Sequence, residues 1–186
     1  MNVILASQSP RRKELMGLLR IPFTVRVADI DESMDPSLPP ADEVARVSRL
    51  KAEAVSRQET DTVIAADTIV VCDGAVLGKP KDEAHARQML TMLSGKAHQV
   101  MTGLTVLRGN ECVCCTQITD VYFRELTQDE ILSYIATGEP MDKAGAYGIQ
   151  GLAALFVKRV EGDYCNVIGL PVCRLSQILK EMENSQ

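Results

Sequence analysis

Side chains of both charge signs interrupt an otherwise apolar chain, and this combination suits chemistry on a polyphosphate. The candidate cations are Arg11, Arg12, Lys51, Lys79 and Lys143, and the candidate carboxylates are Glu32, Asp67 and Asp142. Cations can hold phosphate oxygens, while carboxylates can bind Mg²⁺ or Mn²⁺ and orient a water. The set therefore predicts metal-assisted hydrolysis of a phosphoanhydride, whereas a simple binding module would need fewer of these groups.

The first charged segment follows an apolar run, residues 3–6, and reads as strand, turn and helix. Ser9 is a good N-cap and Pro10 suits the first helical position, so free backbone donors point toward the turn. Arg11 and Arg12 in the first helical turn oppose the helix dipole unless an anion normally lies beside them. A phosphate-rich ligand is predicted, although two solvated surface arginines beside an ordinary cap remain the alternative.

Asp67 interrupts the apolar run at residues 62–72, which we expect to be a strand buried on both faces. An ionised carboxylate there is costly unless it is paired, hydrogen-bonded or near a cation, so a polar cleft is expected to reach it. Asp67 is the candidate water-activating base, and Glu32 is the preferred metal ligand. The alternative is a carboxylate satisfied by nearby backbone or a lysine.

Three lysines lie where they could serve such a site. Lys51 falls on the apolar stripe of a helix expected from about residue 42 to 57, where it could also snorkel from the edge of the stripe. Lys79 follows a hairpin predicted by Asp73-Gly74, at a turn where it could equally have no partner. Lys143 lies in residues 139–151, a glycine-rich segment without the dinucleotide fingerprint, which is either functional or a flexible surface loop.

The composition narrows the possible partners. The 186 residues, 46% of them hydrophobic, suffice for one domain or two closely joined lobes. A net charge of −5 argues against broad binding to nucleic acid or to anionic membranes, so phosphate recognition must be local. No apolar run is long enough to cross a bilayer and no leader pattern opens the chain, so we expect no membrane association and a cytoplasmic location.

The six cysteines do not follow a metal-binding or disulfide pattern. No paired C-x-x-C motif is present, and Cys112, Cys114 and Cys115 would fall on both faces of one strand. They are interpreted as reduced, small apolar residues. Zinc and a Cys–His nucleophile are therefore not expected.

The remaining pattern alternates helices and strands, which predicts a mixed α/β fold. Asp82 is expected to cap a helix over residues 83–93, and Thr127 to open a capping-box helix that ends near Gly138. The other expected elements are strands at 23–27, 98–107, 111–123, 156–157 and 167–168, a turn at 161–163, and a final helix from Pro171.

Several separated motifs together resemble the Maf family of nucleoside triphosphate pyrophosphatases. They are residues 5–12 (Leu-Ala-Ser-Gln-Ser-Pro-Arg-Arg), Asp31-Glu32, 66–70 (Ala-Asp-Thr-Ile-Val), Gly78-Lys79-Pro80, 142–151 (Asp-Lys-Ala-Gly-Ala-Tyr-Gly-Ile-Gln-Gly) and 167–171 (Val-Ile-Gly-Leu-Pro). Their order and spacing match over nearly the whole chain. A set of motifs is far more specific than any one of them.

The resemblance implies one domain over residues 1–186, with an elongated, inosine-triphosphatase-like fold: a mixed twisted sheet, flanking helices and two lobes around a central cleft. It implies a hydrolase that needs Mg²⁺ or Mn²⁺ and cuts between the α and β phosphates. The position of Asp67 is then the proton acceptor. Positions matching Ser7, Arg11, Arg12, Glu32, Lys51 and Lys79 line the phosphate and metal region. Members are often dimeric, which leaves a homodimer open.

The resemblance also points to a substrate class. The branch that acts on dTTP and UTP carries the residues found here as Arg11, Thr68 and Gln150. Neutral Thr68 and Gln150 can both donate and accept hydrogen bonds, which suits the imide edge of thymine or uracil. A house-cleaning pyrophosphatase is therefore expected. A nucleotide-binding regulator of cell division with little turnover, and a phosphatase acting on monophosphates, are the alternatives.

Overall fold

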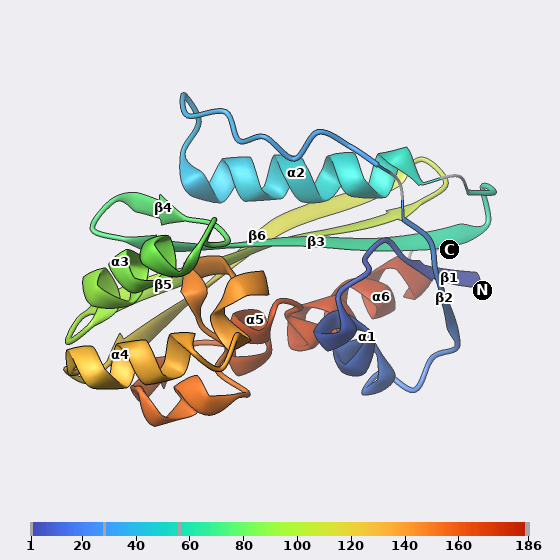
Figure 1. Ribbon diagram of the computed structural model, residues 1–186. Coiled ribbons are helices and arrows are strands. Elements are labelled where there is room, and N and C mark those ends of the chain that lie inside the picture. The colour runs from blue at the N-terminus through green and yellow to red at the C-terminus, as the bar shows by residue number, and fades with distance from the viewer. Residues whose placement is uncertain (1, 28, 56, 185–186) are drawn as a thin grey trace. The chain divides into compact units, whose positions relative to one another are not determined.

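The computed structural model describes residues 2–27, 29–55 and 57–184 (Figure 1). Its strands form a seven-stranded mixed sheet in the order β2-β1-β3-β5-β6-β7, with β4 paired to β3. The strands are β1 (Asn2–Leu5), β2 (Phe23–Val25), β3 (Asp61–Cys72), β4 (Ala75–Leu77), β5 (Ala97–Arg108), β6 (Glu111–Phe123) and β7 (Val157–Glu161). The predicted mixed α/β class is confirmed.

Helices follow the strands along the chain. The α-helices are α1 (Pro10–Gly17), α2 (Pro40–Ala54), α3 (Glu83–Leu93), α4 (Gln128–Ile135), α5 (Tyr164–Ile168) and α6 (Val172–Asn184). Three short 3₁₀ helices are η1 (Glu139–Asp142), η2 (Ala144–Ala146) and η3 (Leu152–Leu155). Among the described residues, no helix combines the length and the apolar character needed to cross a membrane.

The chain forms two compact units. The first unit comprises Met1–Asp67, Thr102–Gln117 and Gly169–Gln186, and the second comprises Thr68–Met101 and Ile118–Ile168. Strands β3, β5 and β6 each contribute residues to both units.

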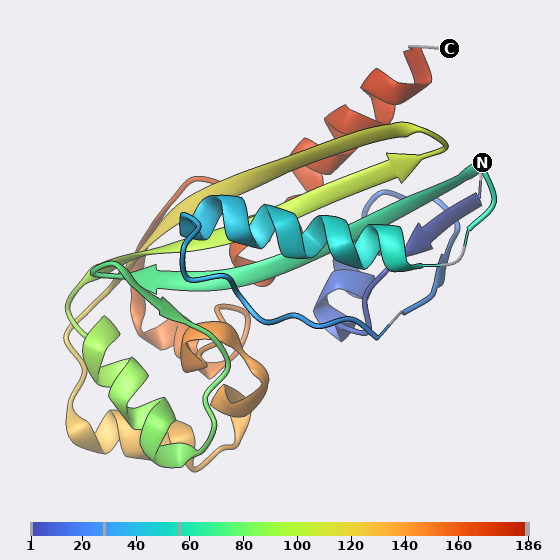
Figure 2. The same cartoon turned by 90° about the horizontal axis from the view of Figure 1, so that it is seen from above.

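In the first unit, β1 lies between β2 and β3 and is parallel to both. Helix α2 covers one face of this part of the sheet, whereas α1 and α6 lie on the other face (Figures 1 and 2). Ala52 of α2 and the following Val55 pack in one buried cluster with Ile4 of β1 and Val63 of β3. Burial of apolar side chains on both faces explains why these strands have nearly continuous apolar sequences.

In the second unit, β3 turns directly into β4 through Asp73 and Gly74, whose φ angles are 49° and 78°. Two positive φ angles are the requirement of a type I′ turn, so the predicted hairpin is confirmed. Helices α3 and α4 lie side by side (Figure 2), joined at the surface by two hydrogen bonds from Arg87 to Gln128. Asp82 and Thr127 cap these helices as predicted, and Thr127 forms a capping box.

The expected strand at residues 167–168 is wrong, because the structure has helix α5 there. Asp163 Oδ1 accepts hydrogen bonds from the backbone N–H groups of Cys165 and Asn166, at 2.8 and 3.2 Å, and so caps a single helical turn. The Asn166 side chain is buried and donates to Val100 O and to Thr119 Oγ1, both at 3.0 Å. These tertiary contacts outweigh the β-propensity of Val167 and Ile168.

Other expected boundaries shift by a few residues. Helix α2 begins two residues before the expected Asp42 and ends at Ala54, and β2 ends at Val25. Ser56, inside the expected helix, lies outside the described residues. The segment 139–151 is no solvated loop, since it contains 3₁₀ turns and buries Gly145, Ala146 and Tyr147.

Candidate active site

The start of α1 is built as the sequence predicts. Ser9 caps the helix, its Oγ accepting a hydrogen bond from Arg12 N at 3.4 Å, and Pro10 takes the first helical position. Ser7 is 6% exposed, and its Oγ accepts from Ser9 N at 3.2 Å and from Arg12 Nη1 at 3.3 Å. Arg12 Nε donates to Gly169 O at 2.7 Å. The Arg12 guanidinium therefore contacts two separate segments of the first unit, at Ser7 and at Gly169.

Arg12 lies within electrostatic reach of both proposed carboxylates. Burial is the main cause that lowers the pKa of its guanidinium, and the neighbouring charge of Arg11 lowers it further. The carboxylates of Asp67 and Glu32 act in the opposite direction and favour the charged form. An arginine that is partly desolvated can bind a phosphate strongly, because little water has to be displaced.

Lys51 links the two carboxylates directly. Its Nζ lies 2.7 Å from Asp67 Oδ1 and 2.9 Å from Glu32 Oε2. The Lys51 and Asp67 side chains are 13% and 16% exposed, so this pair is mostly buried but still open to solvent. Glu32 is far more open, at 59% exposed. Lys51 is thus not a lysine that snorkels from the edge of the apolar stripe. Its contact with Asp67 also agrees with the alternative in which a lysine simply satisfies this carboxylate.

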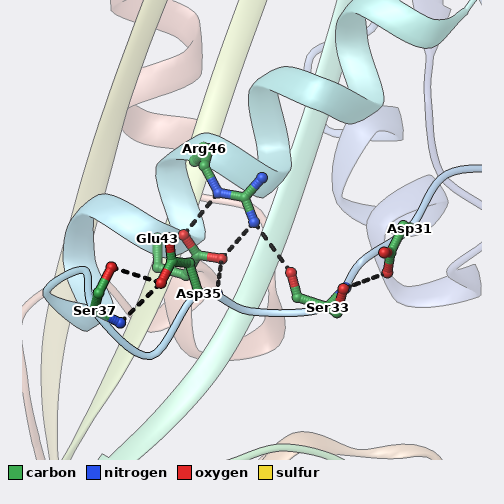
Figure 3. Close-up of polar contacts among 6 residues, drawn as sticks. All are labelled: Asp31, Ser33, Asp35, Ser37, Glu43 and Arg46. Atoms are coloured by element: carbon green, nitrogen blue, oxygen red, sulfur yellow. Dashed lines mark hydrogen bonds and ion pairs between the residues drawn. The ribbon is translucent and has the colours of Figure 1, made fainter.

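The loop that carries Glu32 is held by the first turns of α2 (Figure 3). Arg46 Nε and Nη2 donate to the two carboxylate oxygens of Glu43, and Nη2 also donates to Ser33 O at 3.1 Å. Glu43 Oε1 accepts a further hydrogen bond from Asp35 N at 2.7 Å. The Arg46 guanidinium is the largest cause that lowers the pKa of the buried Glu43 carboxyl.

Two further carboxylates shape the same loop. Asp31 Oδ1 accepts from the backbone N–H and the hydroxyl of Ser33, and Asp35 Oδ1 does the same with Ser37. These hydrogen bonds lower the pKa of both aspartates. Both are local turns of a kind that aspartate favours. The first spans Glu32, and the second lies a few residues after it.

In the second unit, the segments that carry Lys79 and Lys143 lie together. Gly145 N donates to Gly78 O at 3.1 Å, and Gly145 adopts a φ of 69° against the side chain of Val70. Lys79, next to Gly78, is exposed. Lys143 is half-buried, and its Nζ donates to Glu139 O at 2.6 Å and to Asp142 Oδ1 at 2.7 Å.

Gln150 is exposed in a turn closed by the hydrogen bond from Gly151 N to Gly148 O at 3.0 Å. Tyr134 Oη accepts from Gly148 N at 3.2 Å on one side of this turn. On the other side, Glu139 Oε2 accepts from Leu152 N at 3.1 Å. Tyr134 Oη in turn donates to Glu139 Oε1 at 2.9 Å, so one tyrosine–glutamate pair supports both ends.

Sequence reasoning missed these supporting residues. Tyr134 reads as one of the apolar positions of α4, and Glu139 as part of a glycine-rich segment. In the structure, a β-carbon at Gly151 would collide with the Glu139 carboxylate, but this proximity is visible only after folding. Glu43 and Arg46 have only helical spacing, which is the ordinary spacing of a surface ion pair.

The residues predicted for the site thus divide between the two units, with Asp142, the neighbour of Lys143, in the second. In the first unit are Ser7, Arg11, Arg12, Glu32, Lys51 and Asp67, and in the second are Thr68, Lys79, Lys143 and Gln150. Within the first unit, the structure brings Lys51, Glu32 and Asp67 into contact and places Arg12 near both carboxylates. Asp67 and Thr68 are consecutive residues of β3, at the point where the units divide.

The donor set suits a hard divalent cation. Glu32 and Asp67 each direct a carboxylate oxygen at one ammonium, which shows that both can face the same positive charge. Mg²⁺ usually takes one or two protein carboxylates and completes its coordination with water and substrate phosphates. Among the described residues no group of three or more His, Cys, Asp or Glu side chains forms a closed site, and all six cysteines are free thiols.

Comparison with solved structures defines the class of fold. The chain is similar to a HAM1 protein from Coxiella burnetii, with a TM-score of 0.52 and 14% identity over 97% of this chain and 99% of the other. It is equally similar to the Ham1 protein of Staphylococcus aureus, with a TM-score of 0.52 and 14% identity over 98% and 100% of the two chains. At this identity the likeness concerns the fold alone.

Comparison with sequences is closer. The model of the family described as Maf-like protein matches residues 2–182. A dTTP/UTP pyrophosphatase of Moorella thermoacetica is 52% identical over 181 residues, covering 95% of this chain and 93% of the other. One of Bacillus cytotoxicus is 49% identical over 182 residues, covering 97% and 95%. The chain therefore belongs to the Maf family, and the resemblance stated from its motifs is confirmed.

Proposed function

We propose that this chain hydrolyses dTTP and UTP to the monophosphate and pyrophosphate, and so cleans the cellular nucleotide pool. The observation that carries the proposal is the convergence of Glu32 and Asp67 on Lys51, with Arg12 in electrostatic reach of both carboxylates. The names of the Moorella and Bacillus relatives supply the substrate class. The resemblance of its motifs to the family implies the same class through Arg11, Thr68 and Gln150.

In this proposal Asp67 acts as the general base. It takes a proton from a water whose oxygen adds to a phosphorus of the α–β bridge, the bridging P–O bond breaks, and pyrophosphate leaves. Asp67 is suited to this role because β3 holds it rigidly and its side chain keeps some contact with solvent. Arg11, Arg12, Lys51, Lys79 and Lys143, with the hydroxyl of Ser7, bind and orient the triphosphate.

Glu32 and Asp67 would hold Mg²⁺ or Mn²⁺. Such an ion, when bound, neutralises negative charge that develops on phosphate oxygens and helps to orient the attacking water. The two carboxylates fit this role because they are oxygen ligands that already face one cation. Thr68 and Gln150 would read the pyrimidine edge by hydrogen bonds.

The wider setting is part of the same proposal. We propose that the chain acts as one domain, since the family model spans residues 2–182 and three strands contribute to both units. A cytoplasmic location is supported by the six free thiols, which suit a reducing compartment. A homodimer remains a prediction that light scattering of the purified chain would test.

Product analysis tests the proposal. The purified chain is incubated with dTTP, UTP, CTP, 5-methyl-UTP and 7-methyl-GTP in the presence of Mg²⁺ or Mn²⁺, and the products are separated. We expect monophosphate and pyrophosphate from dTTP and UTP. Free phosphate without pyrophosphate contradicts the proposed bond cleavage, and free phosphate from dTMP indicates a monophosphatase. Tight nucleotide binding without metal-stimulated turnover indicates the regulatory alternative.

A further inference from the structure

The ion pair of Glu43 and Arg46 buries a carboxylate, and a gain in stability does not by itself explain why the chain has such a pair. The Glu43 side chain is 1% exposed, whereas Arg46 is 37% exposed. Burying a carboxylate carries a desolvation penalty that pairing often only offsets, and well-packed apolar residues commonly serve as well or better. We therefore ask which other groups this ion pair holds in place.

Those groups are backbone atoms of the segment just after Glu32 (Figure 3). Arg46 Nη2 donates to the carbonyl of Ser33 at 3.1 Å, and Glu43 Oε1 accepts from Asp35 N at 2.7 Å. The pair therefore holds the chain at two points, one of them adjacent to Glu32. The planar guanidinium can do this because its donors point in fixed directions toward both the carboxylate and the carbonyl.

Helix α2 also supplies Lys51, whose Nζ contacts the Glu32 carboxylate at 2.9 Å. One rigid element thus binds both the side chain of Glu32 and the backbone beside it. Glu32 needs this support because its side chain is 59% exposed, so burial does not define its position. We propose that Arg46, oriented by Glu43, is a positioning residue that fixes Glu32 for binding a divalent cation.

This inference rests on the proposed function for the role of Glu32 as a metal ligand. Substituting a residue that orients a metal-binding side chain typically weakens metal affinity by about 10-fold to 100-fold. The effect of Arg46 should therefore appear in metal affinity and should depend on Glu32 being present. A residue needed only for folding would change stability without this dependence.

The test measures binding of Mn²⁺ to the full chain, with the electron paramagnetic resonance signal of the free ion as the readout. Binding is measured with and without a dTTP analogue that has a methylene α–β bridge. Arg46→Lys keeps a positive charge beside Glu43 but loses the planar fork. We expect it to weaken Mn²⁺ binding about tenfold or more with an unchanged fold by circular dichroism. In the Glu32→Gln background, the same substitution should have no further effect.

Arg49→Lys is the matched control. Arg49 lies on the same helix and pairs with Glu53, Nε to Oε1 at 2.7 Å, on an exposed surface. We expect wild-type Mn²⁺ affinity for this variant. Arg46→Met, which leaves Glu43 unpaired, should lose both stability and Mn²⁺ affinity; its affinity is measured at a temperature where the chain remains folded.

The inference is overturned if Arg46→Lys binds Mn²⁺ as tightly as wild type, if its effect persists unchanged in the Glu32→Gln background, or if wild type binds no Mn²⁺. Nucleotide hydrolysis is measured separately with each variant. A chain that hydrolyses dTTP but shows no Arg46 effect retains the proposed function and loses only this inference. A chain in which Arg46 affects Mn²⁺ binding through Glu32 but which hydrolyses no nucleotide retains this inference and loses the proposed function.

Discussion

Lys51 of α2 donates from Nζ to Asp67 Oδ1 of β3 over 2.7 Å, in a pair whose side chains are both less than one-fifth exposed. The lysine gives the carboxylate in the middle of an apolar strand the partner that its burial requires. The same ammonium also meets Glu32 at 2.9 Å. A single cation therefore joins the proposed base and the proposed metal ligand.

Asp67→Asn should lower kcat with dTTP by about 10²-fold to 10⁴-fold, since asparagine cannot accept the proton of the attacking water. The chain should stay folded and keep its nucleotide affinity, because asparagine preserves the shape of the side chain and Lys51 retains Glu32 as a charged partner. Steady-state kinetics, nucleotide binding and thermal denaturation measure these effects. The control is Asp73→Asn at the exposed hairpin turn, where asparagine suits the positive φ of 49° and turnover should be kept. An unchanged kcat in Asp67→Asn removes this residue from the base role.

Gln150→Glu should reduce kcat/KM for UTP about tenfold or more, because a carboxylate cannot donate to a uracil carbonyl and leaves that acceptor unpaired. Gln150 is exposed, so the stability of the fold should not change. Gln88→Glu on the exposed surface of α3 adds the same charge as a control and should have wild-type kinetics. Equal kinetics of the two variants would show that Gln150 does not contact the base.

Tyr134→Phe should lower the ratio of kcat/KM for UTP to that for CTP about fivefold, which corresponds to one lost hydrogen bond of about 1 kcal/mol. The hydroxyl is the partner of both Gly148 N and Glu139, so its loss loosens the turn that carries Gln150. Tyr122→Phe removes a similar hydroxyl–carboxylate contact, to Glu161 at 3.1 Å, and should leave the ratio unchanged. A lower stability with an unchanged ratio would limit Tyr134 to a structural role.

His98 should make the fold sensitive to acid. It is 2% exposed, its Nε2 contacts Tyr147 Oη at 2.8 Å, and burial lowers its pKa from 6.5 to about 4. The unfolded chain therefore binds a proton at a higher pH than the folded chain does. As the pH falls from about 6.5 to about 4, the free energy of unfolding should decrease by about 3 kcal/mol through this residue.

Urea denaturation at several pH values measures this effect. His98→Gln should lose this part of the pH dependence, whereas His85→Gln, a change of the partly exposed histidine near the start of α3, should retain it. The same slope in wild type and His98→Gln would contradict the assignment.

Gly103→Ala should destabilise the first unit by about 3 kcal/mol, because a β-carbon at this buried position would collide with the carbonyl of Val44 in α2. The neighbouring atoms belong to the backbone, which cannot move aside as a side chain can. Gly17→Ala is the control, since a β-carbon there meets nothing within 4 Å. Thermal denaturation compares the two variants, and equal melting temperatures would show that α2 can shift to accept the added carbon.

Local sequence signals predicted much of the fold correctly. The caps of α1, α3 and α4 and the Asp73-Gly74 hairpin depend on hydrogen bonds and φ angles of adjacent residues, so the sequence carries them directly. The single-turn helix α5 was missed because Asn166 is fixed by Val100 and Thr119, which are distant in the chain. Local propensity contains no term for such contacts.

The amino-acid sequence by itself determined which residue types are available for chemistry, the mixed α/β class and the family, because these follow from local pattern and motif order. Only the tertiary structure decided that Lys51 faces both Glu32 and Asp67, that Arg46 holds the backbone beside Glu32, and that Tyr134 with Glu139 supports the Gln150 turn. Each of these contacts joins segments that are separated along the chain, and this separation does not indicate how close the segments lie in the folded protein. The packing of α2 on the sheet, and of α4 against the segment that follows it, creates them.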